Sequence, residues 1–164
     1  MKLAKLLSAD QIILDMKSVE HWPAIMELVG HLAETRRLPP ALKDEILEAL
    51  KAREALVSTG IGSGVAIPHA FSDHIDEVAA IFGRSKAGID FEALDNAPVH
   101  LIILFIVPSK DYPLHLQTLA AIAKMFTTCE VLRRFGEAET PDEILDILNS
   151  KPRLSSNRSL NIQS

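Results

Sequence analysis

The residues best suited to chemistry lie in one stretch, Ser58 to His69, with the sequence STGIGSGVAIPH. Its glycines alternate along the chain, and glycine adopts positive φ easily and lets a backbone approach a ligand closely. Loops rich in free N–H groups bind anions, and His69 follows such a loop and a short apolar run. The stretch therefore indicates phosphate chemistry on the imidazole of His69. We expect the hydroxyl and glycine residues at its start to contact the phosphate: Ser58, Thr59, Gly60 and Gly62.

The glycine spacing argues against two nucleotide-binding motifs. A P-loop requires a lysine after its last glycine, and a dinucleotide fingerprint requires Gly-x-Gly-x-x-Gly at the opening of a helix. Here the spacing is Gly-x-Gly-x-Gly, followed by an apolar run that should end as a strand at Pro68. A plainer interpretation stays open, in which the glycines form a turn between two strands and His69 is an ordinary surface residue.

Two further side chains are candidates for the same site. Arg53 stands at the end of a helix predicted over 41–53, just before the glycines, where it could reach a bound anion. His115 falls in the first turn of a helix that Asp111 is expected to cap; a positive helix end disfavours imidazolium and favours an approaching anion. Each residue also has a structural interpretation, as a cation at a helix C-terminus and as a histidine at a helix start.

The elements that must position these residues alternate between strands and helices. The run 99–107 is almost continuously apolar, which is typical of a central strand buried on both faces. Helical spacing predicts a helix beginning near His21, which we interpret as a surface residue of that helix. We therefore expect an α/β domain with a mostly buried sheet. Further elements are predicted as strands over 11–16 and 78–86 and as helices over 128–135 and from 140 onward.

Length and composition set outer limits on the protein. The 164 residues suggest one domain, and the net charge of −5 argues against general nucleic-acid binding. The longest apolar run, 101–107, is too short to span a bilayer, so we do not expect a membrane-embedded protein. A lone Cys129 and the lack of a signal-peptide pattern fit a cytoplasmic location. We expect the domain to occupy 1–150 and the polar segment 151–164 to be a flexible tail.

The stretch from Arg53 to His69 resembles the signature of the fructose/mannitol-type (type 2) enzyme IIA of the bacterial phosphotransferase system. The segments 94–99 (LDNAPV) and 115–120 (HLQTLA) match this family as well, and the resemblance runs from about residue 3 to residue 149. It implies a mixed sheet flanked by helices on both faces. It also implies that His69 accepts a phosphoryl group from the phosphocarrier HPr as a phosphohistidine, that Arg53 and His115 line the site, and that no metal or nucleotide takes part.

Two branches of this family use the phosphoryl group differently after the first transfer. Sugar-specific members pass it to an enzyme IIB and so to a transported sugar, whereas nitrogen-regulatory members control other proteins through their phosphorylation state. The segment 95–98 (DNAP) and the pair Arg133-Arg134 look more like the regulatory branch, and at 164 residues we expect no IIB or membrane domain in this chain. We therefore expect a nitrogen-regulatory IIA, with the sugar-specific component as the alternative.

Two other functions stay open at this point. The protein could be a regulatory binding module that kept the fold and lost the transfer, although its Arg53, His69 and His115 are intact. It could also be a metal-dependent hydrolase using His69, Asp73 and His74. Zinc sites usually need three or four tetrahedrally arranged ligands, and this spacing on a turn is weak support for one.

Overall fold

The sheet is organised around strand β6 (Val99–Pro108), in which nine of ten residues are buried. In the computed structural model, which describes residues 5–126 and 128–149, β6 pairs antiparallel with β5 (Ala79–Ile89) along one side. Along its other side it pairs in parallel with β3 (Val65–Ala66) and β4 (His69–Ser72). The central strand predicted from the apolar run is thus confirmed.

Two short strands complete the mixed sheet. Strand β1 (Ile12–Ile13) pairs in parallel with β5, and β2 (Gly60–Gly62) pairs antiparallel with β3. The strand order is β1-β5-β6-β3-β2, with β4 attached to β6 outside this path.

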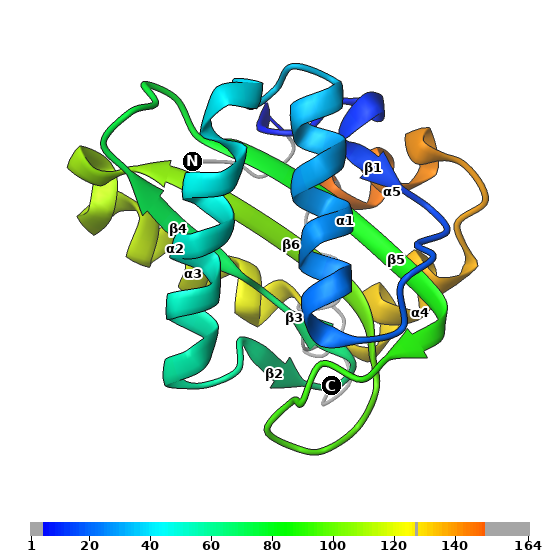
Figure 1. Ribbon diagram of the computed structural model, residues 1–164. Helices are drawn as coiled ribbons and strands as arrows, with labels where there is room; N and C mark the ends of the chain where they lie inside the picture. Colours follow the sequence, from blue (N-terminus) through cyan, green and yellow to red (C-terminus); the bar gives the residue numbers. More distant parts are fainter. Residues whose placement is uncertain (1–4, 127, 150–164) are drawn as a thin grey trace.

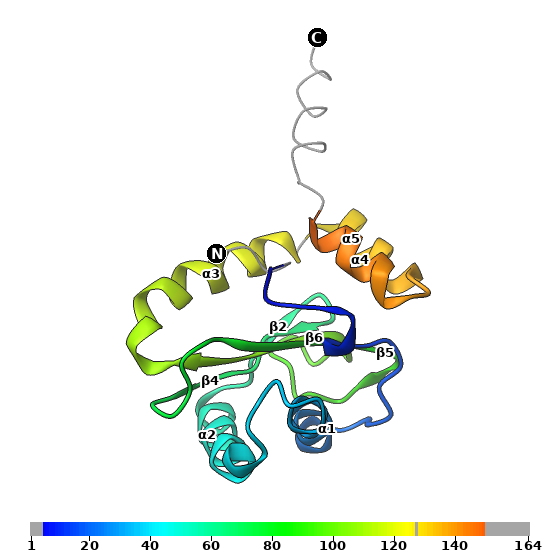
Figure 2. The ribbon, with the colours of Figure 1, turned by 90° about the horizontal axis from the view of Figure 1, so that it is seen from above.

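Helices cover both faces of the sheet, as Figures 1 and 2 show. One face carries α1 (His21–Glu34) and α2 (Lys43–Leu56). The other carries α3 (Tyr112–Met125), α4 (Cys129–Glu137) and α5 (Pro141–Asn149). Short 3₁₀ turns precede several of these elements: η2 (Ala9–Gln11), η3 (Pro40–Leu42) and η4 (Ser109–Asp111). The α/β fold with a sheet between two helical layers is confirmed.

Each helical layer encloses its own hydrophobic core against the sheet. Side chains of β6 alternate between the two cores, because successive residues of a strand point to opposite faces. Ile102 and Leu104 belong to the core under α1 and α2, whereas Ile103 and Phe105 belong to the core under α3, α4 and α5. Burying each such side chain contributes about 1.5–3 kcal/mol to folding, which explains why the strand is apolar on both faces.

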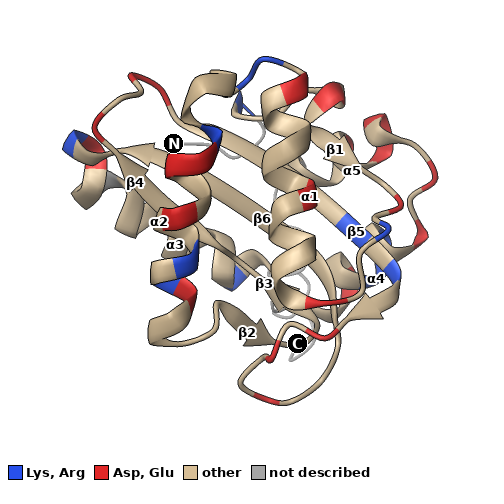
Figure 3. Cartoon of the chain, in the orientation of Figure 1, with Lys and Arg blue, Asp and Glu red and all other residues tan. Residues whose placement is uncertain are grey.

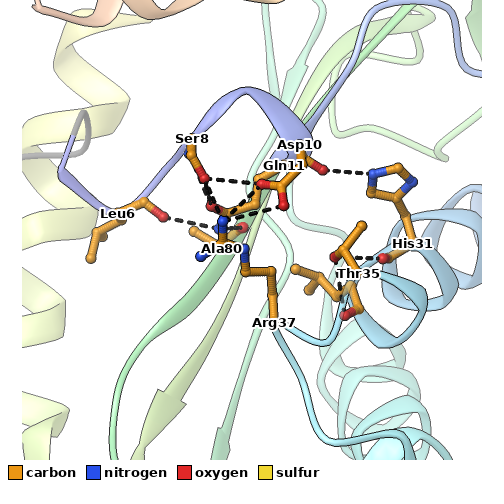
Figure 4. Close-up of polar contacts among 9 residues, drawn as sticks. Leu6, Ser8, Asp10, Gln11, His31, Thr35, Arg37 and Ala80 are labelled. Atoms are coloured by element: carbon orange, nitrogen blue, oxygen red, sulfur yellow. Dashed lines mark hydrogen bonds and ion pairs between the residues drawn. The ribbon is translucent and has the colours of Figure 1, made fainter.

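The predicted strand over 11–16 was wrong in its extent, because only Ile12 and Ile13 are paired. Gln11 belongs to a 3₁₀ turn instead, and its amide nitrogen donates to the backbone oxygens of Leu6 (3.0 Å) and Ala80 (2.7 Å). Figure 4 shows this network, in which Arg37 also reaches the Asp10 carboxylate at 3.0 Å. Hydrogen bonds from a side chain to the backbone, such as those of Gln11, compete with the formation of a regular strand.

Charged residues are distributed over the molecule rather than gathered on one side. Figure 3 shows acidic residues alone on α1 and both signs on α2, and this face carries no continuous basic stripe within the described part of the chain. Among residues 5–126 and 128–149, no helix is long and apolar enough to cross a membrane.

Candidate functional site

The glycine stretch folds into a hairpin. Strands β2 and β3 pair across a turn of Ser63 and Gly64, which have positive φ (58° and 80°), as does Gly62 (98°) at the end of β2. Gly60 is required for a different reason, since a Cβ there would lie 2.7 Å from Cβ of Ala93. The backbone therefore matches the plainer interpretation of these glycines, a turn between two strands, and the tip of the hairpin lies beside His100 at the start of β6.

The hydroxyls ahead of the glycines have partners within the protein. Ser58 Oγ donates to the Phe91 carbonyl at 3.1 Å and accepts from the Gly60 N–H at 3.1 Å. Thr59 donates twice to the Glu54 carboxylate, through its N–H at 3.1 Å and its Oγ1 at 2.5 Å. Phosphate contacts by Ser58, Thr59, Gly60 and Gly62 stay a prediction.

His69 opens β4 rather than ending the strand before it. The ladder breaks at Ile67 and Pro68 and resumes with His69 opposite Phe105. The break arises because proline has no N–H to donate, while the Pro68 carbonyl still accepts from the Phe105 N–H at 3.0 Å. The offset between paired residues is 36 before the break (101 minus 65) and 36 after it (105 minus 69), so the register is kept.

One hydrogen bond determines which nitrogen of His69 is free. Nδ1 of His69 lies 2.9 Å from the Ile67 carbonyl oxygen, which can only accept. Nδ1 therefore carries the proton of the neutral ring, and Nε2 holds the free lone pair.

The surroundings of His69 favour its neutral form. Burial is the largest influence and lowers the pKa of His69; the bond to the Ile67 carbonyl raises it, the charge of Arg53 lowers it and that of Glu54 raises it. The net pKa lies below the usual 6.5. At neutral pH the ring is thus an uncharged imidazole with an available nucleophilic nitrogen.

His115 lies against His69 in a buried setting. It is in the first turns of α3 behind Asp111, which occupies the predicted N-cap position without a side-chain capping bond. Its ring centroid is 5.7 Å from that of His69 and 5.5 Å from those of Phe71 and Phe105. Burial, followed by the charge of His69, lowers the pKa of His115 to about 4.

The buried Nε2 of His115 has no hydrogen-bond partner within the described part of the chain. An unpaired buried polar atom costs roughly 1–3 kcal/mol. This nitrogen is therefore suited to a polar ligand that arrives beside His69.

Arg53 completes the group. It lies in the last turn of α2, as predicted, and its Nη1 donates to the Val57 carbonyl at 2.8 Å. In Figures 1 and 2, β4 lies between α2, which carries Arg53, on one face and α3, which carries His115, on the other. His69 and His115 thus lie close together and the charge of Arg53 acts on His69, whereas the tip of the glycine hairpin lies beside His100 at the start of β6.

The other residues considered for metal binding are exposed. Nδ1 of His74 lies 2.8 Å from Oε2 of Glu45 on α2, and Asp73 precedes it on the same turn. In the described ranges, no group of three or more His, Cys, Asp or Glu residues is placed to hold a metal ion.

A second histidine–carboxylate pair, His21 and Glu54, was not predicted from the sequence. His21 was predicted to be a surface residue, but its side chain is only 16% exposed, and its Nε2 lies 2.8 Å from Oε1 of Glu54. The ring also packs on Phe91, with centroids 4.0 Å apart. The sequence hinted at Glu54 only through its position directly after Arg53. His21 and Glu54 come from different helices, so no local pattern links the two residues.

Burial lowers the pKa of His21, but the hydrogen bond and charge of Glu54, with smaller effects of Glu92, outweigh it and leave the pKa above 6.5. Burial raises the pKa of Glu54, but the bonds from His21 and Thr59 outweigh it and leave that pKa below its usual value. Both directions favour the ion pair. The pair lines a cavity of about 540 Å³ that Trp22 and Lys51 also border.

Comparison with known proteins adds a family match and named relatives. A family model described as "Phosphoenolpyruvate-dependent sugar phosphotransferase system, EIIA 2" matches residues 5–151. The "PTS system fructose-specific EIIABC component" of Bacillus subtilis is 36% identical over 91% of this chain, which spans 23% of that relative's length. The "Nitrogen regulatory protein" of Pseudomonas aeruginosa is 32% identical over 87% of this chain and 96% of its own length.

A solved structure agrees with these matches. The "Nitrogen Regulatory Protein IIA-Ntr" of Neisseria meningitidis superposes with a TM-score of 0.82 and 29% identity, over 90% of this chain and 99% of its own. The fold described above is therefore shared along nearly the whole length of both chains.

Proposed function

The chain belongs to the EIIA 2 family of the phosphoenolpyruvate-dependent sugar phosphotransferase system, and on that basis we propose that it carries a phosphoryl group on Nε2 of His69. The donor is a phosphorylated carrier protein of the HPr type, and the product is a phosphohistidine. The observation that carries this assignment is the pairing of two imidazoles 5.7 Å apart, one with a free nucleophilic nitrogen and the other with an unpaired buried nitrogen.

The transfer step follows from the state of the His69 ring. The lone pair of Nε2 attacks the phosphorus of the carrier, the N–P bond forms, and the bond between phosphorus and carrier breaks with its electron pair returning to the carrier. No proton has to leave Nε2, because the ring proton is on Nδ1 and is held by the Ile67 carbonyl. Phosphoryl transfer depends mainly on such positioning and on charge stabilisation.

Two side chains supply that charge stabilisation in this proposal. Arg53 presents a permanently charged guanidinium whose planar fork matches phosphate oxygens, and its field already acts on His69. His115 donates a hydrogen bond from Nε2 to a phosphoryl oxygen and so satisfies the atom that lacks a partner. Ser58, Thr59, Gly60 and Gly62 are the remaining candidates for phosphate contact.

The nitrogen-regulatory branch is the assignment that we favour for this chain. It is supported by the segment 95–98, the pair Arg133-Arg134 and the TM-score of 0.82 with the Neisseria meningitidis protein. The second candidate is a sugar-specific IIA, which the 36% identity to the fructose-specific Bacillus subtilis relative supports. Rapid loss of the phosphoryl group to a fructose-specific enzyme IIB would favour this second candidate.

Phosphorylation with a purified carrier system tests the assignment of His69. Incubation with phosphoenolpyruvate, enzyme I and HPr should raise the intact mass by one acid-labile phosphoryl group. His69→Ala should abolish the increase. His74→Ala should leave it unchanged, because His74 is exposed and paired with Glu45 away from the site. A mass increase of wild-type size in His69→Ala would contradict the proposal.

A further inference from the structure

A continuous chain of hydrogen bonds runs from His21 to His69. Nε2 of His21 contacts Oε1 of Glu54 at 2.8 Å, and the Glu54 carboxylate accepts two hydrogen bonds from Thr59. The Thr59 carbonyl then accepts from the Ile67 N–H at 3.0 Å. The Ile67 carbonyl finally accepts from Nδ1 of His69 at 2.9 Å.

This series of hydrogen bonds has two properties that suit it to control the orientation of the His69 imidazole. Its middle members are largely shielded from water, since the side chain of Glu54 is only 6% exposed and Thr59 is buried. It also acts on a backbone already held from the other side, because the Pro68 carbonyl accepts from the Phe105 N–H. The Ile67–Pro68 segment is therefore fixed between Thr59 and β6.

We propose that His21 and Glu54 are positioning residues for His69: acting through Thr59 and the backbone of Ile67, they keep its proton on Nδ1 and its lone pair on Nε2. The expected effect on the proton of the His69 ring depends on these contacts alone. The expected effect on the rate of phosphoryl transfer rests on the proposed function.

This positioning role accounts for a histidine–carboxylate pair at this place. Glu54 already receives two bonds from Thr59, and His21 supplies the positive partner that keeps the carboxylate ionised and oriented in its buried position. Outer-shell partners that orient metal ligands change activity by about 10- to 100-fold when they are lost, and we expect an effect at the low end of that range for this longer series. A pair that only joined α1 to α2 would leave the His69 ring unchanged.

The test is nuclear magnetic resonance of protein with ¹⁵N-labelled histidine, which reports the protonated nitrogen of His69 without any phosphorylation. In the wild type at neutral pH, we expect the proton on Nδ1. In His21→Ala and Glu54→Ala, we expect part of the population to shift to the Nε2-protonated form. The near-isosteric variants His21→Gln and Glu54→Gln, which each keep one hydrogen bond, should restore part of the wild-type population.

Transfer kinetics form the second measurement on the same variants. We expect kcat for phosphorylation by HPr to fall about 10-fold in His21→Ala and Glu54→Ala, with a much smaller change in KM. His74→Ala is the matched control: it breaks another histidine–glutamate pair of the same length, 2.8 Å, that also uses α2 but is exposed. It should change neither the His69 ring nor kcat.

The outcomes separate this proposal from the proposed function. An unchanged His69 ring in folded His21→Ala and Glu54→Ala would overturn the positioning role, even with normal phosphorylation of His69. A fall in kcat without any shift of the His69 proton would also overturn it, because the loss would then act elsewhere. A shifted proton in protein that never becomes phosphorylated on His69 would support the positioning role and reject the proposed function instead.

Discussion

His115 is the residue that distinguishes this site from a single histidine at the end of a strand. Its ring is packed between aromatic side chains, and its pKa of about 4 keeps it uncharged over the physiological range. A neutral imidazole can donate one hydrogen bond without repelling the Arg53 guanidinium. At the scale of single residues, the proposed function therefore uses one nucleophile, one neutral donor and one fixed cation.

Substitution of His115 separates the donor from the acceptor. His115→Ala should still be phosphorylated on His69, but the phosphoryl group should be passed on more slowly, because removing one such donor can cost on the order of 10²–10³ in rate. His115→Gln keeps an N–H donor and should recover part of that loss. Single-turnover transfer measured by mass spectrometry checks both variants. Peptide mapping that finds the phosphate on His115 in the wild type would reverse the two roles.

At the scale of elements, Arg84 joins the sheet to the helical layer of α4 and α5. It lies in β5 with only 4% of its side chain exposed. Its Nε donates to the Leu14 carbonyl at 3.0 Å, and its Nη1 donates to the carbonyls of Phe135 and Ala138 beyond the sheet. A cation near the end of α4 also interacts favourably with the helix dipole.

Loss of this cation should affect stability rather than chemistry. Arg84→Met keeps much of the packing volume but leaves buried carbonyls without donors, so we expect a loss of roughly 3 kcal/mol in unfolding free energy. Arg133→Met is the matched control, because Arg133 is an exposed arginine of α4 paired with Glu130 and Glu137. It should change stability by less than about 0.5 kcal/mol. Urea denaturation measures both; similar losses would contradict the role of Arg84.

The elements themselves were largely predictable, whereas the contacts between them were not. The apolar run of β6 and the helical spacing from His21 are local patterns, and both elements were found where they were predicted. The pairs His21–Glu54 and Arg84–Phe135 join residues 33 and 51 positions apart. No local pattern encodes such a pair, so the burial of His21 and of Arg84 could not be predicted from the sequence.

The glycine stretch shows the same division within the site. Residue types alone marked it as a candidate site, and the expected proximity of His69 and His115 is found, with their ring centroids 5.7 Å apart. The role of the individual glycines could not be predicted, because the steric constraint on Gly60 comes from Ala93 in a distant loop. Hydrogen bonds that occupy Ser58 and Thr59 also come from residues outside the stretch.

At the scale of the whole molecule, the buried histidines make stability depend on pH. The folded-state pKa values of His69 and His115 are below 6.5, so stability is lost as the pH falls below 6.5 toward those values. For His115, with a pKa of about 4, the loss between pH 7 and pH 5 is about 2 kcal/mol. His21 acts in the opposite sense: its contribution is present below pH 6.5 and is lost as the pH rises through its raised pKa.

Urea midpoints at pH 7 and pH 5 check this dependence. The wild type should be less stable at pH 5, and His115→Gln should lose less between the two values, because its side chain does not titrate. Equal losses of stability in the two proteins would contradict a lowered pKa of His115 in the folded protein. The pKa values of Glu54 and Asp10 are below their usual range, so the stability lost when these carboxylates are protonated is lost at a lower pH.

The kept register across Ile67 and Pro68 has a consequence for how this sequence can vary. With a constant offset of 36 to β6, Val65, Ile67 and Phe71 pack toward α3, whereas Ala66 and Ala70 pack toward α2. Adding or deleting one residue here would turn every following side chain to the other face of the sheet. His69 would then point away from His115. We therefore expect related sequences to tolerate substitutions in this segment better than single-residue insertions or deletions.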